Sequence, residues 1–247
     1  MLKFAVVVPM FNEEPGAENC VTQICGVLSA IPDAESKLIT VNDGSRDRTG
    51  EILDRLAPRF PNLLVVHHPH NQGYGAALRT GAETAARAGF DYALFMDSDL
   101  TNHPSDIPRF VDKMREGVDV IKATRYSKGG RVEGVPLYRV LISRVGNLVA
   151  SVLFALPIRD CTNGFRAVRT GILTSMRLGE NRFPIIMEEL YWSKYLARTF
   201  AEIPVTLTNR DASLRPTSFA YKPSVFWQYL KYPLWAFTGK RPPISHT

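Results

Sequence analysis

Short apolar runs rich in β-branched residues alternate with longer amphipathic segments along the first half of the chain. The short runs predict five strands, at residues 4–8, 37–42, 63–67, 92–97 and 118–124. The segments between them predict helices at residues 17–30, 49–57, 74–88 and 107–116. This alternation is typical of βαβ units, so we predict an α/β fold with a mostly parallel central sheet flanked by helices.

Each of the first four predicted strands ends in a polar cluster. The clusters are Asn12-Glu13-Glu14, Asp43-Gly44-Ser45, Asn71-Gln72-Gly73 and Asp97-Ser98-Asp99. In open α/β sheets, ligands bind outside the carboxyl ends of the strands. We therefore expect the four clusters to line one shared site.

The alternation breaks down after the fifth strand, where a basic, apolar stretch at residues 137–158 precedes shorter, irregular elements. No repeat or low-complexity tract divides the chain. We predict one domain at residues 1–215, made of halves at 1–125 and 126–215. The tail at residues 216–247 mixes aromatic side chains with lysine and arginine, which suits a membrane surface.

Composition narrows the range of partners. The 247 residues are 45% apolar and carry a formal net charge of +6, which allows one large core and favours anionic partners such as phosphates, nucleotides or acidic lipids. The basic residues are scattered and no nucleic-acid-binding pattern is present, so we expect no nucleic-acid partner. Three irregularly spaced cysteines, Cys20, Cys25 and Cys161, indicate a reducing compartment.

Hydropathy also bears on membranes. Pro9 ends the apolar run at residues 4–8 before it could act as a signal-peptide core, so we expect a cytoplasmic protein, with at most peripheral contact to the cytoplasmic face of a membrane. No run approaches the roughly 20 apolar residues of a membrane span. The stretch at 137–158 carries Arg139 and Arg144 on an otherwise apolar segment. It predicts either a helix in the membrane interface, with its arginines toward lipid phosphate, or a helix buried in the core.

The strongest chemical signal is Asp97-Ser98-Asp99 at the end of an apolar run. Residues two apart on an extended strand project to the same side, so both carboxylates can face one cation. Mg2+ or Mn2+ would suit them and would neutralise charge on a diphosphate leaving group. The alternative is that these acids cap a helix that begins near Pro104.

Two further clusters supply context. Asp43 follows a buried strand and enters a glycine turn, so its carboxylate is either an acceptor for a nucleobase or ribose or part of ordinary turn chemistry. Gly73 and Gly75 allow the backbone to approach a ligand, and the helix after them offers free N–H groups to phosphate or sugar oxygens. Arg79 in that helix suits either ligand binding or packing.

In this order, the clusters resemble the nucleotide-binding half of family 2 glycosyltransferases with the GT-A fold. The resemblance continues downstream, over about residues 4–215. Residues 160–166, Asp-Cys-Thr-Asn-Gly-Phe-Arg, are similar to the Asp-x-Thr-Ser-Gly-Phe-Arg segment of the dolichyl-phosphate mannose synthase branch. Residues 122–126, Lys-Ala-Thr-Arg-Tyr, resemble the Gly-Ser-Arg-Tyr strand end of that branch.

The resemblance and the clusters together mark a candidate role for each matching residue. The candidates for nucleotide-sugar binding are Pro9, Asn12, Glu13, Asp43, Asn71, Gly73, Gly75, Arg79, Asp97 and Ser98. The candidates for the metal are Asp97, Asp99 and Thr101. The catalytic candidates are Asp97, Asp99, Glu188, Arg125 and Arg166. The candidates for the acceptor or its phosphate are Arg125, Arg139, Asp160, Asn163, Arg210 and Arg215.

Two departures from the branch affect these roles. Thr101 stands where the branch has a glutamine, so a third metal ligand would have to come from Thr101 through a water. The phosphate-closing loop of the branch, Arg-x-x-Gly-x-Ser-Lys, is matched loosely by residues 210–215, where Ser213 replaces the glycine.

The resemblance implies inverting transfer from a nucleotide sugar of the GDP-mannose or UDP-glucose type to an acceptor, with a polyprenyl (dolichyl-type) phosphate preferred. That phosphate is already ionised and needs no general base. A saccharide hydroxyl is the alternative acceptor and would need one, for which Glu188 is the candidate, unless Glu188 is a solvated helix-start acid. A catalytically silent nucleotide-sugar-binding protein is a third possibility, and the oligomeric state stays open.

Overall fold

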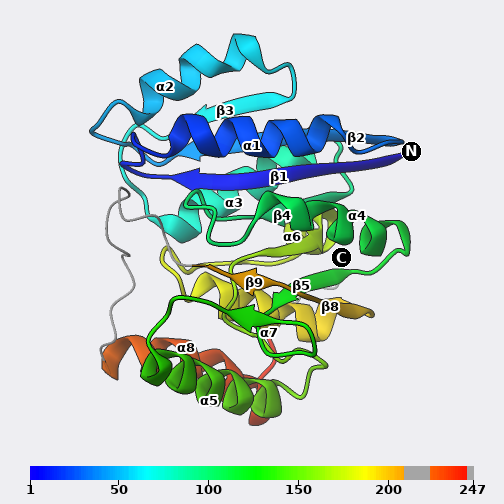
Figure 1. The fold of residues 1–247 in the computed structure, drawn as a ribbon. Coiled ribbons are helices and arrows are strands. Elements are labelled where there is room, and N and C mark those ends of the chain that lie inside the picture. Colours follow the sequence, from blue (N-terminus) through cyan, green and yellow to red (C-terminus); the bar gives the residue numbers. More distant parts are fainter. Residues whose placement is uncertain (209–222, 244–247) are drawn as a thin grey trace.

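The computed structural model of the protein describes residues 1–208 and 223–243. Its large sheet has seven strands in the order β3-β2-β1-β4-β7-β5-β8 (Figure 1). These strands are β1 (Leu2–Met10), β2 (Ala34–Asn42), β3 (Leu63–His67), β4 (Tyr92–Phe95), β5 (Val120–Thr124), β7 (Arg166–Arg169) and β8 (Phe200–Pro204). Only β7 runs antiparallel to its neighbours β4 and β5, so the predicted mostly parallel sheet is confirmed for the described residues. A small sheet pairs β6 (Arg131–Val132) with β9 (Thr206–Leu207).

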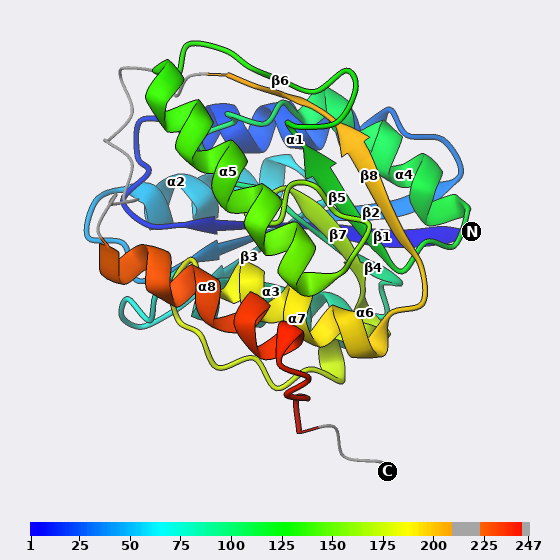
Figure 2. The ribbon, with the colours of Figure 1, turned by 90° about the horizontal axis from the view of Figure 1, so that it is seen from below.

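Helices cover both faces of the large sheet. One face carries α1 (Ala17–Ser29), α2 (Thr49–Leu56) and α4 (Ile107–Arg115), and the other carries α3 (Tyr74–Arg87), α6 (Thr170–Thr174) and α7 (Ile185–Leu196). Two longer helices, α5 (Leu137–Phe154) and α8 (Pro223–Phe237), lie side by side at one end of the molecule, where α8 also packs on α7 (Figure 2). Short 3-10 helices are η1 (Ala57–Arg59) and η2 (Pro104–Asp106).

The apolar periodicity located the first half of the fold closely. Each of the four predicted helices begins at the predicted residue and ends one residue earlier than predicted, with α1 ending at Ser29. In β1, every residue from Phe4 to Met10 is buried, because helices cover the strand on both sides. β2 begins at Ala34, three residues before the predicted start, and its added residues are only half-buried.

The strand order reverses direction at β1. The chain passes from β1 to β2 on one side and later returns to β4 on the other side. At such a reversal the loops after neighbouring strands diverge and leave room for a ligand. The loops after β1, β2 and β4 carry three of the four polar clusters, so the sheet brings these clusters to one edge as predicted.

α5 exposes several large apolar side chains. Leu137, Leu148 and Val152 are 86%, 64% and 66% exposed, and the buried residues of this helix are Asn147, Ala150 and Phe154. The interpretation of this stretch as a buried core helix is therefore wrong. With 18 residues, a mean hydropathy of 1.4 and 17% of its residues buried, α5 is long and apolar enough to cross a membrane by length and composition, which the sequence had not led us to expect.

Candidate active site

A cavity of about 410 Å³ opens beside the carboxyl end of β4 and extends between α5 and α8. Its charged lining residues are Asp97, Arg125 and Arg139. Most of the remaining wall is apolar and includes Ile142, Val149, Ala150, Ile186, Met187, Phe226 and Leu230. The cavity thus joins a charged end near the sheet to an apolar end between the two outer helices.

Asp97 and Asp99 follow β4, and each carboxylate is oriented by a hydroxyl. The phenol of Tyr74 donates to Asp97 Oδ1 at 2.9 Å. The backbone N–H and hydroxyl of Thr101 donate to Asp99 Oδ1 at 3.1 and 2.9 Å. Thr101 therefore holds the Asp99 carboxylate in place. The sequence had suggested another role for Thr101, that of a metal ligand acting through a water. Ser98 between the two acids is half-buried.

The acids do not cap the following helix, so that alternative is excluded. The N-cap of η2 is His103, whose side chain accepts a hydrogen bond from the Ser105 N–H. Leu100 has a positive φ of 55°, a sparsely populated backbone conformation that turns the chain between the acids and η2. Strain of this kind is found mainly at functional sites.

The charges of Glu13 and of the two aspartates act on one buried thiol, that of Cys20. Burial raises the pKa of the Cys20 thiol in α1, and the negative charges of Asp99, Glu13 and Asp97 raise it further. All three carboxylates are therefore near one buried sulfur atom. Glu13 itself is 4% exposed, and its backbone N–H donates to the Thr49 hydroxyl at 2.9 Å.

The loop after β1 is fastened to the loop after β2. The Asn12 N–H donates to the Ser45 hydroxyl at 3.0 Å, and the Asn12 side-chain oxygen accepts from the Arg46 N–H at 2.8 Å. Asn12 has a positive φ of 54°, and Pro9 is buried inside β1. Asn12 thus joins the loops after β1 and β2, and the contact of Asn12 and Pro9 with a nucleotide stays a prediction.

The carboxylate of Asp43 binds the loop after β3 through several hydrogen bonds. Its two carboxylate oxygens accept hydrogen bonds from the Asn71 side chain (2.9 Å), the Gln72 N–H (2.9 Å) and the Gly73 N–H (2.8 Å). The ring nitrogen Nδ1 of His68 lies 2.7 Å from Asp43 Oδ1. With four partners and 3% exposure, Asp43 acts within the protein by shaping this loop, and its expected contact with a nucleobase is not favoured.

The glycine loop faces another part of the protein. A Cβ atom at Gly73 would collide with the Asn181 carbonyl, and one at Gly75 would collide with the Glu180 carbonyl. Arg79 donates to the same two residues, to the Glu180 carbonyl at 2.6 Å and to Asn181 Oδ1 at 2.5 Å. The glycines and Arg79 therefore seat the loop that precedes α7, which favours the packing role left open for Arg79.

Partly exposed Arg125 forms an ion pair with fully buried Asp160 beside the cavity. Arg125 donates through Nε to Asp160 Oδ2 at 2.7 Å and through a terminal nitrogen to Oδ1 at 2.8 Å. Burial alone would raise the pKa of Asp160, but the charge and hydrogen bonds of Arg125 hold that pKa below its ordinary value. The pair fixes Arg125 at the cavity wall with a defined orientation.

Arg166 lies under the site without lining the cavity. It is fully buried, donates to both carboxylate oxygens of Glu189 at 2.6 and 2.7 Å, and donates to the Gly164 carbonyl at 2.8 Å. Its guanidinium also stacks on Phe95, 4.4 Å from the ring centre. With these partners Arg166 supports the 160–166 turn, and direct contact with a substrate, as the sequence had implied, is not favoured.

The same turn is supported from inside by a lysine. Lys122 is fully buried and donates to the carbonyls of Asn163 (2.7 Å) and Cys161 (3.2 Å). Burial lowers the pKa of Lys122 to about 8, aided by the positive charge of Arg166. The side-chain oxygen of Asn163 accepts a hydrogen bond from the Phe165 N–H, so Asn163 also shapes the turn.

Glu188 is not placed as a general base. Its carboxylate accepts hydrogen bonds from the Gly179 N–H at 3.0 Å and the Glu180 N–H at 2.9 Å. The side chain is 7% exposed and is absent from the cavity wall. Glu188 anchors the loop before α7, so neither the base nor the solvated acid expected from the sequence describes it.

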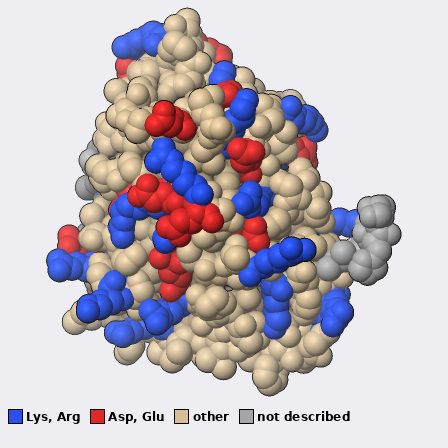
Figure 3. Space-filling model, turned by 90° about the vertical axis from the view of Figure 1, so that its right-hand side faces the viewer, with Lys and Arg blue, Asp and Glu red and all other residues tan. Residues whose placement is uncertain are grey.

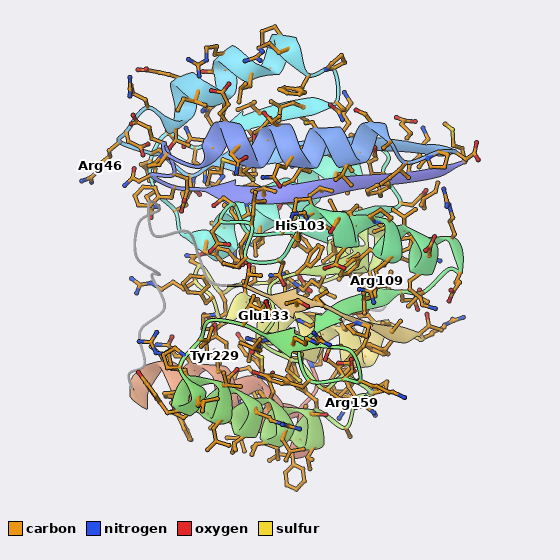
Figure 4. All side chains as sticks on the ribbon, in the orientation of Figure 1. Arg46, His103, Arg109, Glu133, Arg159 and Tyr229 are labelled. Atoms are coloured by element: carbon orange, nitrogen blue, oxygen red, sulfur yellow. The ribbon has the colours of Figure 1, made fainter. Side chains whose placement is uncertain are left out.

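Three residues with a place in the site were missed from the sequence. Tyr74 lies within the glycine motif, which could have indicated it. Tyr229 of α8 lines the cavity, and the charge of Asp97 contributes, after burial, to raising the pKa of Tyr229. Figure 4 shows Tyr229 on the same side of the molecule as Arg46, the side of the carboxyl end of β1. Ser143 of α5 lines the cavity and accepts from the Tyr126 hydroxyl at 2.7 Å.

Two predicted residues, Arg210 and Arg215, lie outside the described residues. The last described residue before them is Thr208, whose N–H donates to the Thr101 carbonyl at 3.1 Å. The chain therefore leaves the described part beside the aspartate motif.

Comparison with known proteins settles the family. The sequence pattern of the family described as Glycosyl transferase family 2 matches residues 5–176. The chain belongs to glycosyl transferase family 2.

Two relatives place this family 2 chain in a branch. It is 32% identical over 209 residues to a dolichol-phosphate mannosyltransferase of Pyrococcus furiosus, covering 83% of this chain and 56% of the relative. It is 30% identical over 218 residues to a polyprenol monophosphomannose synthase of Mycolicibacterium smegmatis, covering 86% of this chain and 80% of the relative. The resemblance to this branch is confirmed, although the chain spans only about half of the Pyrococcus protein.

A solved structure confirms the fold. A glucosyl-3-phosphoglycerate synthase from Mycobacterium tuberculosis, crystallised with Mn2+, uridine diphosphate and phosphoglyceric acid, superposes with a TM-score of 0.68 over 98% of this chain and 80% of the other. The two sequences are 22% identical, so the likeness concerns the fold alone.

Proposed function

We propose that this chain is an inverting, divalent-cation-dependent glycosyltransferase that moves a sugar from a nucleotide sugar to a polyprenyl phosphate. The observation that carries the proposal is the cavity itself, which is charged at Asp97, Arg125 and Arg139 and apolar between α5 and α8. An acceptor with an anionic head and a hydrocarbon tail matches both ends.

The donor side fits a hard divalent cation. Asp97 and Asp99 offer carboxylate oxygens, the ligands that Mg2+ and Mn2+ prefer, and each carboxylate is held by a hydroxyl. Among residues 1–208 and 223–243, no group of three acidic, histidine or cysteine side chains is placed to hold an ion, so the donor's diphosphate and water would complete the ligand set. A cation bound there would stabilise the charge on the departing diphosphate.

The nucleotide sugar is proposed to be GDP-mannose. The two relatives described above are named for mannose transfer. The loops after β1 and β2, whose shape depends on Asn12, Glu13 and the internal bonds of Asp43, would receive the nucleoside, because they lie at the carboxyl ends of these strands.

The acceptor phosphate is proposed to lie between Arg125 and Arg139. Arg125 is pre-oriented by Asp160, so it loses little side-chain freedom when an anion binds. The guanidinium of Arg139 is the second cation of the cavity, on the first turns of α5. The phosphate oxygen attacks the sugar's anomeric carbon as the bond to the diphosphate breaks, and no proton has to be removed. The position of Glu188 is consistent with this, because no base is needed.

The tail of the acceptor requires a lipid surface, and α5 and α8 provide the contact. Exposed apolar side chains gather on these two helices; they are Leu137, Leu141, Ile142, Val145, Leu148, Val149, Val152, Phe226, Trp227 and Phe237. Figure 3 shows Lys and Arg side chains toward the lower part of the molecule, the end formed by α5 and α8, where few Asp and Glu side chains are visible. An apolar surface bordered by cations suits an anionic membrane, so we propose peripheral attachment on the cytoplasmic face.

Transfer from labelled donor tests the proposal. Purified protein with Mn2+ and GDP-[14C]mannose is expected to label a short polyprenyl phosphate in detergent, and parallel reactions contain UDP-[14C]glucose or a free saccharide acceptor. Label on the saccharide alone would replace the lipid acceptor by a sugar hydroxyl. Cation-dependent nucleotide binding without transfer to either acceptor would indicate a binding protein.

A further inference from the structure

The hydrogen bond from Tyr74 to Asp97 joins two parts of the site that lie far apart in sequence. Tyr74 is the first residue of α3, directly after Gly73, and Asp97 follows β4. The phenol oxygen lies 2.9 Å from Asp97 Oδ1, and both residues line the cavity. The bond therefore links the glycine loop to the acid that is proposed to meet the cation.

The tyrosine ring is itself held in place. Its centre lies 4.7 Å from that of Phe183 in the loop before α7. The next residue, Gly75, donates from its N–H to the Asn181 carbonyl of that loop at 2.9 Å. Tyr74 therefore has little freedom to move away from Asp97.

Gly164 closes the other side of the pair. A Cβ atom at this position would lie 3.1 Å from Asp97 Oδ2 and 3.3 Å from the Tyr74 hydroxyl, so only glycine fits without displacing one of them. The Gly164 carbonyl accepts from Arg166, and Glu189 holds Arg166. The buried ion pair of Arg166 and Glu189 thus holds the turn beside Asp97 and Tyr74.

The Tyr74 hydroxyl is the donor of this pair, because the carboxylate oxygen of Asp97, 2.9 Å away, is the acceptor. A neutral O–H donating to an ionised carboxylate is a charge-assisted hydrogen bond, which is stronger than a bond between neutral groups.

We propose that Tyr74 is a positioning residue that fixes the Asp97 carboxylate for the cation and the donor diphosphate. The terminal torsion of an aspartate is broad, so an isolated carboxylate samples many orientations. A hydroxyl on one oxygen restricts that torsion before the ligand arrives. Groups that orient metal ligands in this way typically contribute about 10- to 100-fold to metal affinity or activity. The inference rests on the proposed cation-dependent nucleotide site.

The test is cation-dependent nucleotide binding by Tyr74→Phe, which keeps the ring against Phe183 and removes only the hydroxyl. Mn2+ binding is titrated by electron paramagnetic resonance with saturating GDP, and separately with UDP. We expect affinity about 10- to 100-fold weaker than that of the unaltered protein. In transfer assays, the KM of the nucleotide sugar should rise while the KM of the polyprenyl phosphate is unchanged.

Tyr92→Phe is the matched control. Tyr92 is a buried tyrosine whose hydroxyl donates to the Val118 carbonyl at 2.9 Å, away from the cavity. The Tyr92→Phe variant should have a lower Tm but unchanged Mn2+ affinity. It therefore distinguishes the effect of losing any buried hydroxyl from the effect of losing the bond that positions Asp97.

A double-mutant cycle with Asp97→Asn supplies a second readout. If Tyr74 acts through Asp97, then Tyr74→Phe should cause little further loss in the Asp97→Asn background. Equal losses in both backgrounds, or Mn2+ affinity of Tyr74→Phe equal to that of the unaltered protein, would overturn the inference alone. No Mn2+-dependent binding of GDP or UDP by the unaltered protein would overturn the proposed function together with it.

Discussion

The donor side of the site and the outer helices α5 and α8 differ in how many of their side chains have partners within the protein. Around the donor side, charged groups are matched by internal partners, as Asp43 shows with its four hydrogen-bonding neighbours. On α5, large apolar side chains such as Leu141 and Leu148 are 63% and 64% exposed. The donor side is preorganised for a small polar ligand, whereas the outer helices have apolar surface that a partner must cover.

The largest effect should come from the polar end, where Asp97→Asn removes a charge proposed to hold the cation. We expect kcat/KM to fall by about 100- to 1,000-fold, the range seen when one preorganised electrostatic group is lost. Asp112→Asn is the control, because Asp112 is exposed and its carboxylate lies 3.9 Å from Arg115. A similar loss in both variants would point to general damage, and unchanged turnover in Asp97→Asn would refute the metal assignment.

At the apolar end, the double variant Leu141→Ser and Leu148→Ser should weaken membrane attachment. Each exposed side chain that enters lipid contributes on the order of 1 kcal/mol, so the partition coefficient onto vesicles with anionic lipid should fall about 10- to 100-fold. Tm should fall only slightly, since Leu141 and Leu148 are 63% and 64% exposed. Co-sedimentation measures binding, with Glu83→Ser on the exposed surface of α3 as control. Undiminished binding would mean that these helices are covered by something other than lipid.

The pH dependence of stability tests how buried Lys122 is accommodated beneath the site. The pKa of Lys122 is lowered by burial to about 8, so between that value and the ordinary 10.5 the unfolded chain binds the proton more readily than the folded one. The penalty for burying the charge therefore fades as pH rises, and stability increases. Relative to Lys122→Met, the free energy of unfolding should rise by about 1 kcal/mol between about pH 7.5 and about pH 9. Parallel denaturant curves of both proteins measure it, and a falling difference would show that the folded pKa is not lowered.

The smallest effect is expected for Glu188→Gln. Glutamine keeps an oxygen that can accept the Gly179 and Glu180 N–H groups, so the loop should stay anchored. Loss of a general base typically slows a reaction by about 100- to 10,000-fold, whereas we expect less than about a 5-fold change in kcat. Steady-state transfer to polyprenyl phosphate decides between these outcomes, and a large decrease would restore Glu188 as a base.

The first half of the fold was predictable because its elements have simple periodicities. The apolar runs of β1, β2 and β4 and the amphipathic faces of α1 and α3 located these elements to within a few residues. The antiparallel strand β7 was not foreseen, since Arg166–Arg169 carries two arginines and has no apolar run. Its arginines are accommodated by acids from other elements, Arg166 by Glu189 and Arg169 by Asp119.

The sequence motifs predicted which residues lie at the candidate site better than they predicted what each side chain binds. Asp97, Arg125 and Arg139 do line one cavity. Asp43, Arg166 and Glu188 carry the residue types expected of a site, yet their side chains bind parts of the protein itself. A motif shows which side chains are near a crevice, and hydrogen-bond partners from distant segments decide which of them face a ligand.

From its sequence alone, this protein was determined to be an α/β glycosyltransferase-like chain with polar clusters at the strand ends, because strand and helix periodicities and short motifs are local properties. Only the tertiary structure decided that Asp43 and Glu188 bind internal loops, that Tyr74 reaches Asp97, and that α5 is exposed. Each of those outcomes depends on which surfaces meet across the fold. An apolar helix has the same sequence pattern whether protein or lipid covers it.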